Sequence, residues 1–326
     1  MLNLIQSNLY RLVRSKMVYV ALAIIALYFG MTAYSNYQSS QPADIAQMRL
    51  DLVQMRSEGE DAESIAQTEH MIRAFETRTL DGGFTGADMV GVVPGGLLSI
   101  ILCVLAALFC HQDFSTGFVK NQLSALTGHR VTGERPPIGR GAYYAGTLMT
   151  IAIMNAVFLI VTVTLGIASQ VLLGFTVRDP EPAWQIAAWM FLTWLILCGY
   201  TFFVAAIAWG ERNQAVGAVG ALLVGSQGLE TIIQLVLSTG AQLVPGTGIA
   251  AALEAISAWL PTVSTNILLG GASALFGGTT GGFWEATLQV LSTMAHPLAH
   301  VVVTTCGFLA LGLAIVFLGC RRQDIA

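Results

Sequence analysis

Long runs of apolar residues alternate with short polar stretches along the whole chain. Six of these runs are long enough to cross the ~30 Å hydrocarbon core of a bilayer as α-helices. Their continuous apolar character does not match the alternating ~10-residue segments of outer-membrane β-barrels. The pattern therefore predicts an all-α polytopic membrane protein with six transmembrane helices, at residues 17–34, 89–110, 142–173, 183–209, 214–237 and 298–319.

The composition excludes a soluble protein. Of the 326 residues, 55% are hydrophobic and only 10% are charged, whereas an average soluble domain has about 25% charged residues. The net charge of −4 gives no indication of a nucleic-acid partner. The five cysteines lie within or directly after apolar runs and form no C-x-x-C pair, which argues against a disulfide framework or a zinc ribbon.

The basic residues predict the orientation of the helices. If the N-terminus lies inside, ten of the fifteen Lys and Arg residues fall in inside segments, and fourteen of the nineteen acids fall in outside segments. Basic residues concentrate in the cytoplasmic loops of membrane proteins. We therefore expect both termini in the cytoplasm.

Residues 1–16 are predicted to form an amphipathic helix at the membrane interface. Apolar residues recur at helical spacing and basic residues cluster at its end, before an apolar run longer than the ~7–15 residues of a signal peptide. This pattern favours a retained interfacial helix over a cleaved leader. The apolar positions are Leu2, Ile5, Leu9 and Leu12, and the basic ones are Arg11, Arg14 and Lys16.

Two further segments between the apolar runs have their own patterns. Residues 36–88 carry ten acids and two amphipathic stretches around a turn at Gly59, which predicts an extracellular helical hairpin. Residues 238–297 contain only two charges and many Gly and Ala residues, which predicts short re-entrant helices in the outer leaflet, near 248–259 and 263–275. Two further full crossings are the alternative for this segment. The glycines at 277–282 predict a flexible joint.

The predicted cytoplasmic loop at 111–141 contains a candidate docking segment. Asp113 and Ser115 are expected to cap a short helix, and Gly117 permits close backbone approach. Apolar side chains on the cytoplasmic side, here Phe118 and Leu123, usually occupy a groove of a partner. The chain has no P-loop of its own, because neither of its two lysines follows a glycine.

This loop and the N-terminal segment resemble those of the permease subunits of type-2 ABC transporters. In that family, an acidic-aromatic-Ser-x-Gly-x-x-Lys-Asn-x-Leu segment forms the coupling helix that docks into a separate ATPase subunit. The resemblance extends to the amphipathic elbow helix, here 1–16, and to the helices before the last span. The residues that it assigns to docking are Asp113, Phe114, Ser115, Gly117, Phe118, Val119, Lys120 and Leu123.

The resemblance implies that residues 1–326 form a single transmembrane permease domain of an exporter in the bacterial plasma membrane. Its expected partners are two ATPase subunits, a second permease copy or a paralogue, and membrane lipid. ATP and magnesium would be bound by the ATPase, so this chain is expected to bind no cofactor and to catalyse no reaction itself. A peptide, antibiotic, drug or lipid-like molecule is the expected substrate.

Glu230 is the only charge within a predicted span, where it costs on the order of 2.5–3.5 kcal/mol. Gln227 and Gln234 lie at i−3 and i+4 from it, and together they suggest a polar stripe along a substrate path. A hydrogen-bonded contact between helices is the equally weighted alternative. Glu230 also permits a second hypothesis, a proton-coupled secondary transporter, although the two halves of the sequence show no convincing repeat.

Two weaker patterns lie near the last apolar run. Ser273 and His296 superficially resemble the serine and histidine of rhomboid intramembrane proteases, which gives a third hypothesis. His296 and His300 are one helical turn apart, but the H-E-x-x-H motif of zinc proteases has a glutamate where this chain has Pro297. We therefore predict no metal site there.

Overall fold

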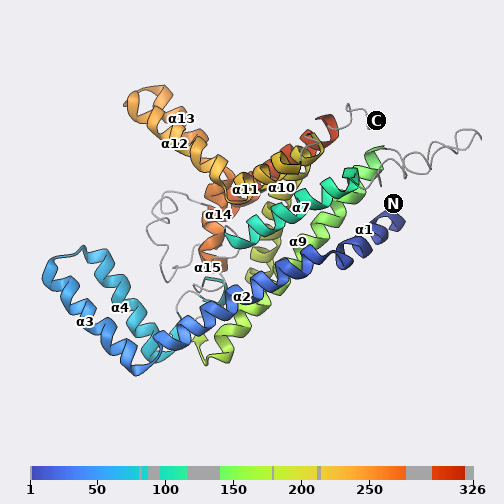
Figure 1. The fold of residues 1–326 in the computed structure, drawn as a ribbon. Helices are drawn as coiled ribbons and strands as arrows, with labels where there is room; N and C mark the ends of the chain where they lie inside the picture. The colour runs from blue at the N-terminus through green and yellow to red at the C-terminus, as the bar shows by residue number, and fades with distance from the viewer. Residues whose placement is uncertain are drawn as a thin grey trace, which may run out of the picture.

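The computed structural model describes residues 2–80, 83–86, 96–115, 140–177, 180–210, 214–276 and 296–319, which are almost entirely helical (Figure 1). The helices are α1 (Leu2–Arg14), α2 (Lys16–Ser39), α3 (Pro42–Glu58), α4 (Ala62–Thr77), α5 (Gly83–Gly86), α7 (Leu97–Ser115), α9 (Arg140–Leu172), α10 (Ala183–Gly210), α11 (Gln214–Gly225), α12 (Gly228–Leu243), α13 (Gly248–Ala258), α14 (Pro261–Leu269), α15 (Gly271–Leu275), α17 (Pro297–Ala314) and the π-helix η2 (Ile315–Gly319). Two short strands, β1 (Thr79–Leu80) and β2 (Thr176–Val177), pair in parallel.

Several of these helices suit a lipid bilayer. Within the described residues, four helices are long and apolar enough to cross a membrane: Lys16–Ser39, Gly141–Leu172, Ala183–Gly210 and Pro297–Leu318. A fifth is present if α11 and α12, which meet at a bend of 57°, count as one span. The apolar part of α7 is shorter, and residues 89–95 of the second predicted span lie outside the described residues. The chain is thus an all-α, multi-pass membrane protein.

Helix α10 lies at the centre of the bundle. It packs against α7, α9, α11, α14 and α17, and its Trp189, Tyr200 and Trp209 side chains are fully buried. A helix that is apolar on all sides is typical of a core surrounded by other helices. Polar contacts add to this packing, because Asn155 of α9 donates to Thr201 of α10 over 2.8 Å.

The helix ends that the charge pattern predicts to be cytoplasmic lie together at one end of the bundle. Leu4 of α1 packs directly on Gly146, near the start of α9. The Tyr144 ring lies 4.8 Å from the Trp209 ring at the end of α10. The π-helix η2 also packs on α9 and α10. Figure 1 shows α1 and the end of α17 at this end of the bundle.

Helices α3 and α4 form a hairpin at the opposite end of the bundle (Figure 1). The predicted pair of helices is therefore present, and the left-handed Gly59, at φ 73°, ends α3 as the turn requires. Two ion pairs, Arg49–Glu76 and Arg56–Glu69, join the two helices. Exposed pairs of this kind contribute only about 0–1 kcal/mol each.

A buried carboxylate near this end of the bundle joins distant parts of the chain by hydrogen bonds. Glu181, only 8% exposed, accepts hydrogen bonds from the Phe84 and Thr85 amides of α5 at 2.6 and 3.2 Å and from the Thr85 hydroxyl. The Thr85 hydroxyl oxygen in turn accepts from the Ala272 amide of α15 at 2.6 Å. The β1–β2 pair joins the same two parts of the chain, the segment before α5 and the segment before α10. The Thr176 amide donates a hydrogen bond to the Arg78 carbonyl there.

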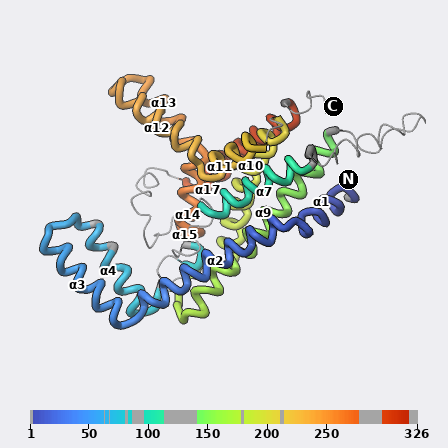
Figure 2. The backbone as a smooth tube through the Cα atoms, viewed as in Figure 1, coloured from blue at the N-terminus to red at the C-terminus, as the bar shows by residue number. Residues whose placement is uncertain are grey.

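The segment 238–297 differs in detail from its prediction. Helix α12 extends to Leu243 and returns as α13, and this pair projects away from the bundle (Figure 2). The predicted helix at 263–275 is divided at Gly270, because Gly271 has φ 83° and ends the regular path of α14. Most of the residues of α14 and α15 are buried against the bundle. The predicted joint at 277–282 lies outside the described residues.

Candidate functional site

The candidate site lies where the fifth predicted helix breaks. The prediction of one continuous helix over 214–237 is wrong, because Gln227 adopts a left-handed conformation at φ 58° between α11 and α12. Gly225 and Gly228 flank the break, and neither favours a continuous helix. Gly225 packs closely on α7, whereas α12 turns away by 57°. The bend places the first turn of α12 beside α10 and α14.

Glu230, in that first turn, is the centre of a hydrogen-bonded group contributed by three helices. The Tyr200 hydroxyl of α10 donates to Glu230 Oε2 over 3.1 Å, and the Thr262 hydroxyl of α14 donates to the same oxygen. Tyr200 Oη also lies 3.4 Å from Thr265 Oγ1. The Tyr200 ring packs edge-on against Phe308 of α17, with 5.0 Å between ring centroids. Glu230 itself is half-buried.

The two glutamines predicted beside Glu230 do not join this group within the described residues. Gln227 belongs to the break and not to the same helix as Glu230; it is 7% exposed, and its Nε2 has no partner in the described part of the chain. Gln234 lies one turn beyond Glu230 on α12 and is half-buried. Glu230 and Gln234 thus share α12, whereas the hydrogen-bond partners of Glu230 come from two other helices.

Sequence reasoning missed Tyr200, Thr262 and Thr265. Each is a neutral hydroxyl residue on a helix, and such hydroxyls commonly bond to their own helix, as Thr201 does with the Leu197 carbonyl. Thr262 and Thr265 stand one turn apart on α14, which begins at Pro261. That spacing puts both hydroxyls on one face, but nothing in the sequence indicates which helix this face meets.

The charge of Glu230 determines what the cluster can do. An ionised carboxylate only accepts hydrogen bonds, and both hydroxyls donate to it. Its position in the first turn of a 16-residue helix adds stabilisation from the helix dipole. Such a group can take up a proton or pair with a cation. The described residues contain no cluster of three or more His, Cys, Asp or Glu side chains that would hold a metal ion.

The predicted docking segment is described only at its start. Asp113, Phe114 and Ser115 form the last turn of α7, which no Gly or Pro interrupts between Leu97 and Ser115. The short helix that Asp113 and Ser115 are predicted to cap lies outside the described residues. Gly117, Phe118, Val119, Lys120 and Leu123 lie outside the described residues.

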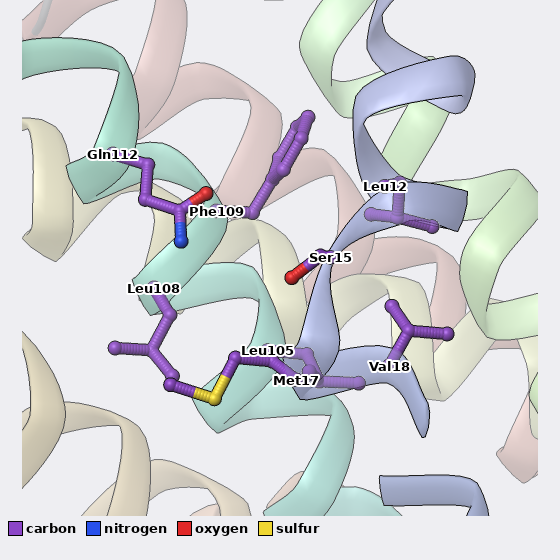
Figure 3. Close-up of a pocket in the computed structure, with 8 residues that line it drawn as sticks. All are labelled: Leu12, Ser15, Met17, Val18, Leu105, Leu108, Phe109 and Gln112. Carbon is purple, nitrogen blue, oxygen red and sulfur yellow. The ribbon is translucent and has the colours of Figure 1, made fainter. Parts of the chain in front are cut away.

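The end of α7 packs against the joint between α1 and α2 (Figure 3). Only Ser15, in an extended conformation, separates the two helices. A cavity of about 10 Å³, the size of one water molecule, lies at this contact. The Arg11 guanidinium lies 5.6 Å from the centre of the Phe109 ring. The residues that line the cavity are Leu12, Ser15, Met17, Val18, Leu105, Leu108, Phe109 and Gln112.

His300 has a structural contact at the start of α17. Its Nε2 lies 2.9 Å from the Ala258 carbonyl oxygen, and its ring stacks on Trp259 with 4.7 Å between centroids. These contacts join α17 to the end of α13.

No protein-family model matches the chain, and no curated protein matches it either.

Proposed function

We propose that the chain is the membrane permease subunit of an ATP-driven ABC exporter. It would move a peptide, antibiotic, drug or lipid-like substrate outward, with energy from a separate ATPase subunit present in two copies. The observation that carries the proposal is the docking-type sequence of residues 113–123, together with the contact between the end of α7 and the amphipathic α1. A second permease copy or a paralogue would complete the complex.

The proposed topology has six spans and both termini in the cytoplasm of a bacterial cell. In it, the second span would be 89–110, as the sequence predicts, and α11 with α12 would form one broken span. Helix α1 would be the interfacial elbow helix, and the α3–α4 hairpin would stand outside. Supporting this topology, the helix ends predicted to share a side lie together in the bundle.

Transmission from the ATPase would begin at the end of α7. ATP binding would close the ATPase dimer and move the docked segment. Because α7 packs on the α1–α2 joint at one end and on Gly225 of α11 further along, its displacement would reach both the elbow helix and the bend before Glu230. Glu230 would then line the path that opens outward.

A proton-coupled secondary transporter is the second candidate, and one observation favours it. Glu230 is an acid held between helices by Tyr200 and Thr262, at a break in a membrane helix, and such breaks bind ions in several transporters. Proton uptake at Glu230 would alter these two contacts.

The docking role of the segment 113–123 can be tested with Phe118→Asp. A charge buried in an ATPase groove without a partner costs about 3 kcal/mol or more, which weakens binding on the order of 100-fold. The tagged variant should insert and purify normally from its native host but lose the ATPase that accompanies the wild type. Val131→Asp, in the same loop but outside the segment, is the matched control and should retain the ATPase. An ATPase that co-purifies equally with Phe118→Asp would refute the docking assignment.

A further inference from the structure

The two oxygens of the Glu230 carboxyl group have different hydrogen-bond partners. Both hydroxyl donors, Tyr200 and Thr262, reach Oε2. The Thr262 backbone also interacts with the carboxyl group, and within the described residues no side chain donates to Oε1. Because Glu230 is half-buried, the carboxyl group is not sealed inside the bundle.

The Glu230 carboxyl group has no positively charged partner in the described part of the chain. No Lys, Arg or His side chain described in the structure forms an ion pair with Glu230; the ion pairs given above lie in the α3–α4 hairpin. Two hydroxyls and a helix N-terminus stabilise an ionised carboxylate but do not neutralise it. A charge in an apolar environment interacts strongly with a counter-charge that reaches it, because the local dielectric constant is low.

Apolar and aromatic side chains lie beside the hydroxyl groups that contact the carboxyl group. The Tyr200 ring, whose hydroxyl contacts the carboxyl group, packs edge-on against the Phe308 ring. On α12, Leu229 and Ile233, the residues one position before and three positions after Glu230, are exposed. A ligand whose positive group reaches the carboxylate would therefore place the rest of its body against apolar side chains. A hard divalent ion does not suit this site, because Ca²⁺ takes six to eight oxygen ligands and Mg²⁺ keeps several waters.

We propose that Glu230 binds the positive group of a hydrophobic organic cation, and that the cargo of the transporter belongs to this class. The proposal rests on the proposed transport function and narrows it. It selects cationic drugs, antibiotics or peptides over neutral lipids and organic anions. Gln227 contributes a second polar group near the bend, since its buried Nε2 lacks a partner among the described residues.

A pair of ions with the same shape and opposite charge tests the proposal. Tetraphenylphosphonium and tetraphenylborate are both hydrophobic, and they differ in the sign of their charge. Binding of each labelled ion is measured to the full chain in nanodiscs of phosphatidylcholine, with empty nanodiscs as the blank. The wild type should bind tetraphenylphosphonium saturably and should show no saturable binding of tetraphenylborate.

Substitutions then locate the binding to one carboxylate. Glu230→Gln retains the shape of the side chain and should weaken tetraphenylphosphonium binding at least tenfold, which corresponds to about 1.4 kcal/mol. Glu230→Asp retains the charge and should keep part of the affinity, which separates a charge effect from a folding defect. Glu254→Gln, on the exposed part of α13, is the matched control and should bind as the wild type does.

Three results would overturn the proposal: no saturable cation binding by the wild type, equal binding by Glu230→Gln, or equal binding of the two ions. These outcomes are separate from those for the transport function. If the ATPase co-purifies but tetraphenylphosphonium does not bind, the exporter hypothesis is retained and the proposal of a cationic cargo is rejected. If the cation binds at Glu230 but no ATPase co-purifies with the chain, the cation site is retained and the exporter hypothesis is rejected.

Discussion

Gly225→Ala tests the close approach of two helices that positions the bend before Glu230. A Cβ atom built on Gly225 would lie 2.8 Å from Ile100 Cα, 3.1 Å from Cys103 Cβ and 3.2 Å from the Ser99 carbonyl oxygen. Two of these three atoms belong to the α7 backbone and cannot rotate away. One added methyl group would therefore force α11 and α7 apart.

The size of the effect follows from two opposing terms. Overpacking of a well-packed contact costs typically about 1–3 kcal/mol. Alanine in place of glycine recovers up to about 1 kcal/mol of helix propensity. We expect a net loss of about 1–2 kcal/mol, and at roughly 2 °C per kcal/mol a fall in Tm of about 2–4 °C.

The assay is thermal unfolding of the purified protein in detergent, followed by tryptophan fluorescence. Gly217→Ala is the control on the same helix, because a Cβ there would meet only Ala208 atoms at 3.9 Å, an ordinary contact distance. That variant should be as stable as the wild type or slightly more stable. If Gly225→Ala unfolds at the same temperature as Gly217→Ala, the close contact between α11 and α7 is not present.

Two other substitutions test the buried polar contacts by the same thermal assay. Thr85→Val removes both the donor to Glu181 and the acceptor of the Ala272 amide, so it should cost about 1–3 kcal/mol, whereas Thr85→Ser should cost much less. Asn155→Asp should cost about 2.5–3.5 kcal/mol because it buries a charge between α9 and α10, whereas Asn155→Leu should change the stability by about 0.6 kcal/mol. Equal stabilities within either pair would contradict the corresponding contact.

The sequence predicts the long helices well because their signal is local. The apolar run of α10 extends over its whole length, and the structure buries it in the centre of the bundle as expected for such a run. The α3–α4 hairpin is predictable for the same reason, since the turn at Gly59 is a local signal that ends the first helix. Neither prediction requires information about distant parts of the chain.

The features that the sequence does not reveal depend on distant residues or on an unusual backbone conformation. Glu181 finds its partners nearly one hundred positions away, at Phe84 and Thr85, and no periodicity connects these segments. The break before α12 uses a left-handed Gln227, a conformation that favours Gly and Asn over most other residues. Gly225 and Gly228 are the local signal for such a break, but they do not predict the left-handed conformation of Gln227 or the direction of α12.

The candidate site contains one residue that the sequence indicates and partners that it does not indicate. Glu230 is predictable as a functional candidate because a single charge in an apolar run is costly and conspicuous. Its partners Tyr200 and Thr262 are not predictable, because the helix break decides which face of α14 the carboxyl group meets. The glutamines nearest to Glu230 in sequence are consequently not its partners among the described residues.

The most direct test of the proposed function is transport by inverted membrane vesicles that contain the chain and its co-purifying ATPase. Uptake of labelled peptides, antibiotics and lipids is measured with ATP, with a pH gradient alone, and with the Glu230→Gln variant assembled to the wild-type level. The exporter hypothesis predicts uptake of at least one compound that requires ATP, does not respond to the pH gradient alone and is lost in Glu230→Gln. Uptake driven by the pH gradient without ATP, or ATP-driven uptake that Glu230→Gln leaves unchanged at every pH, would contradict it.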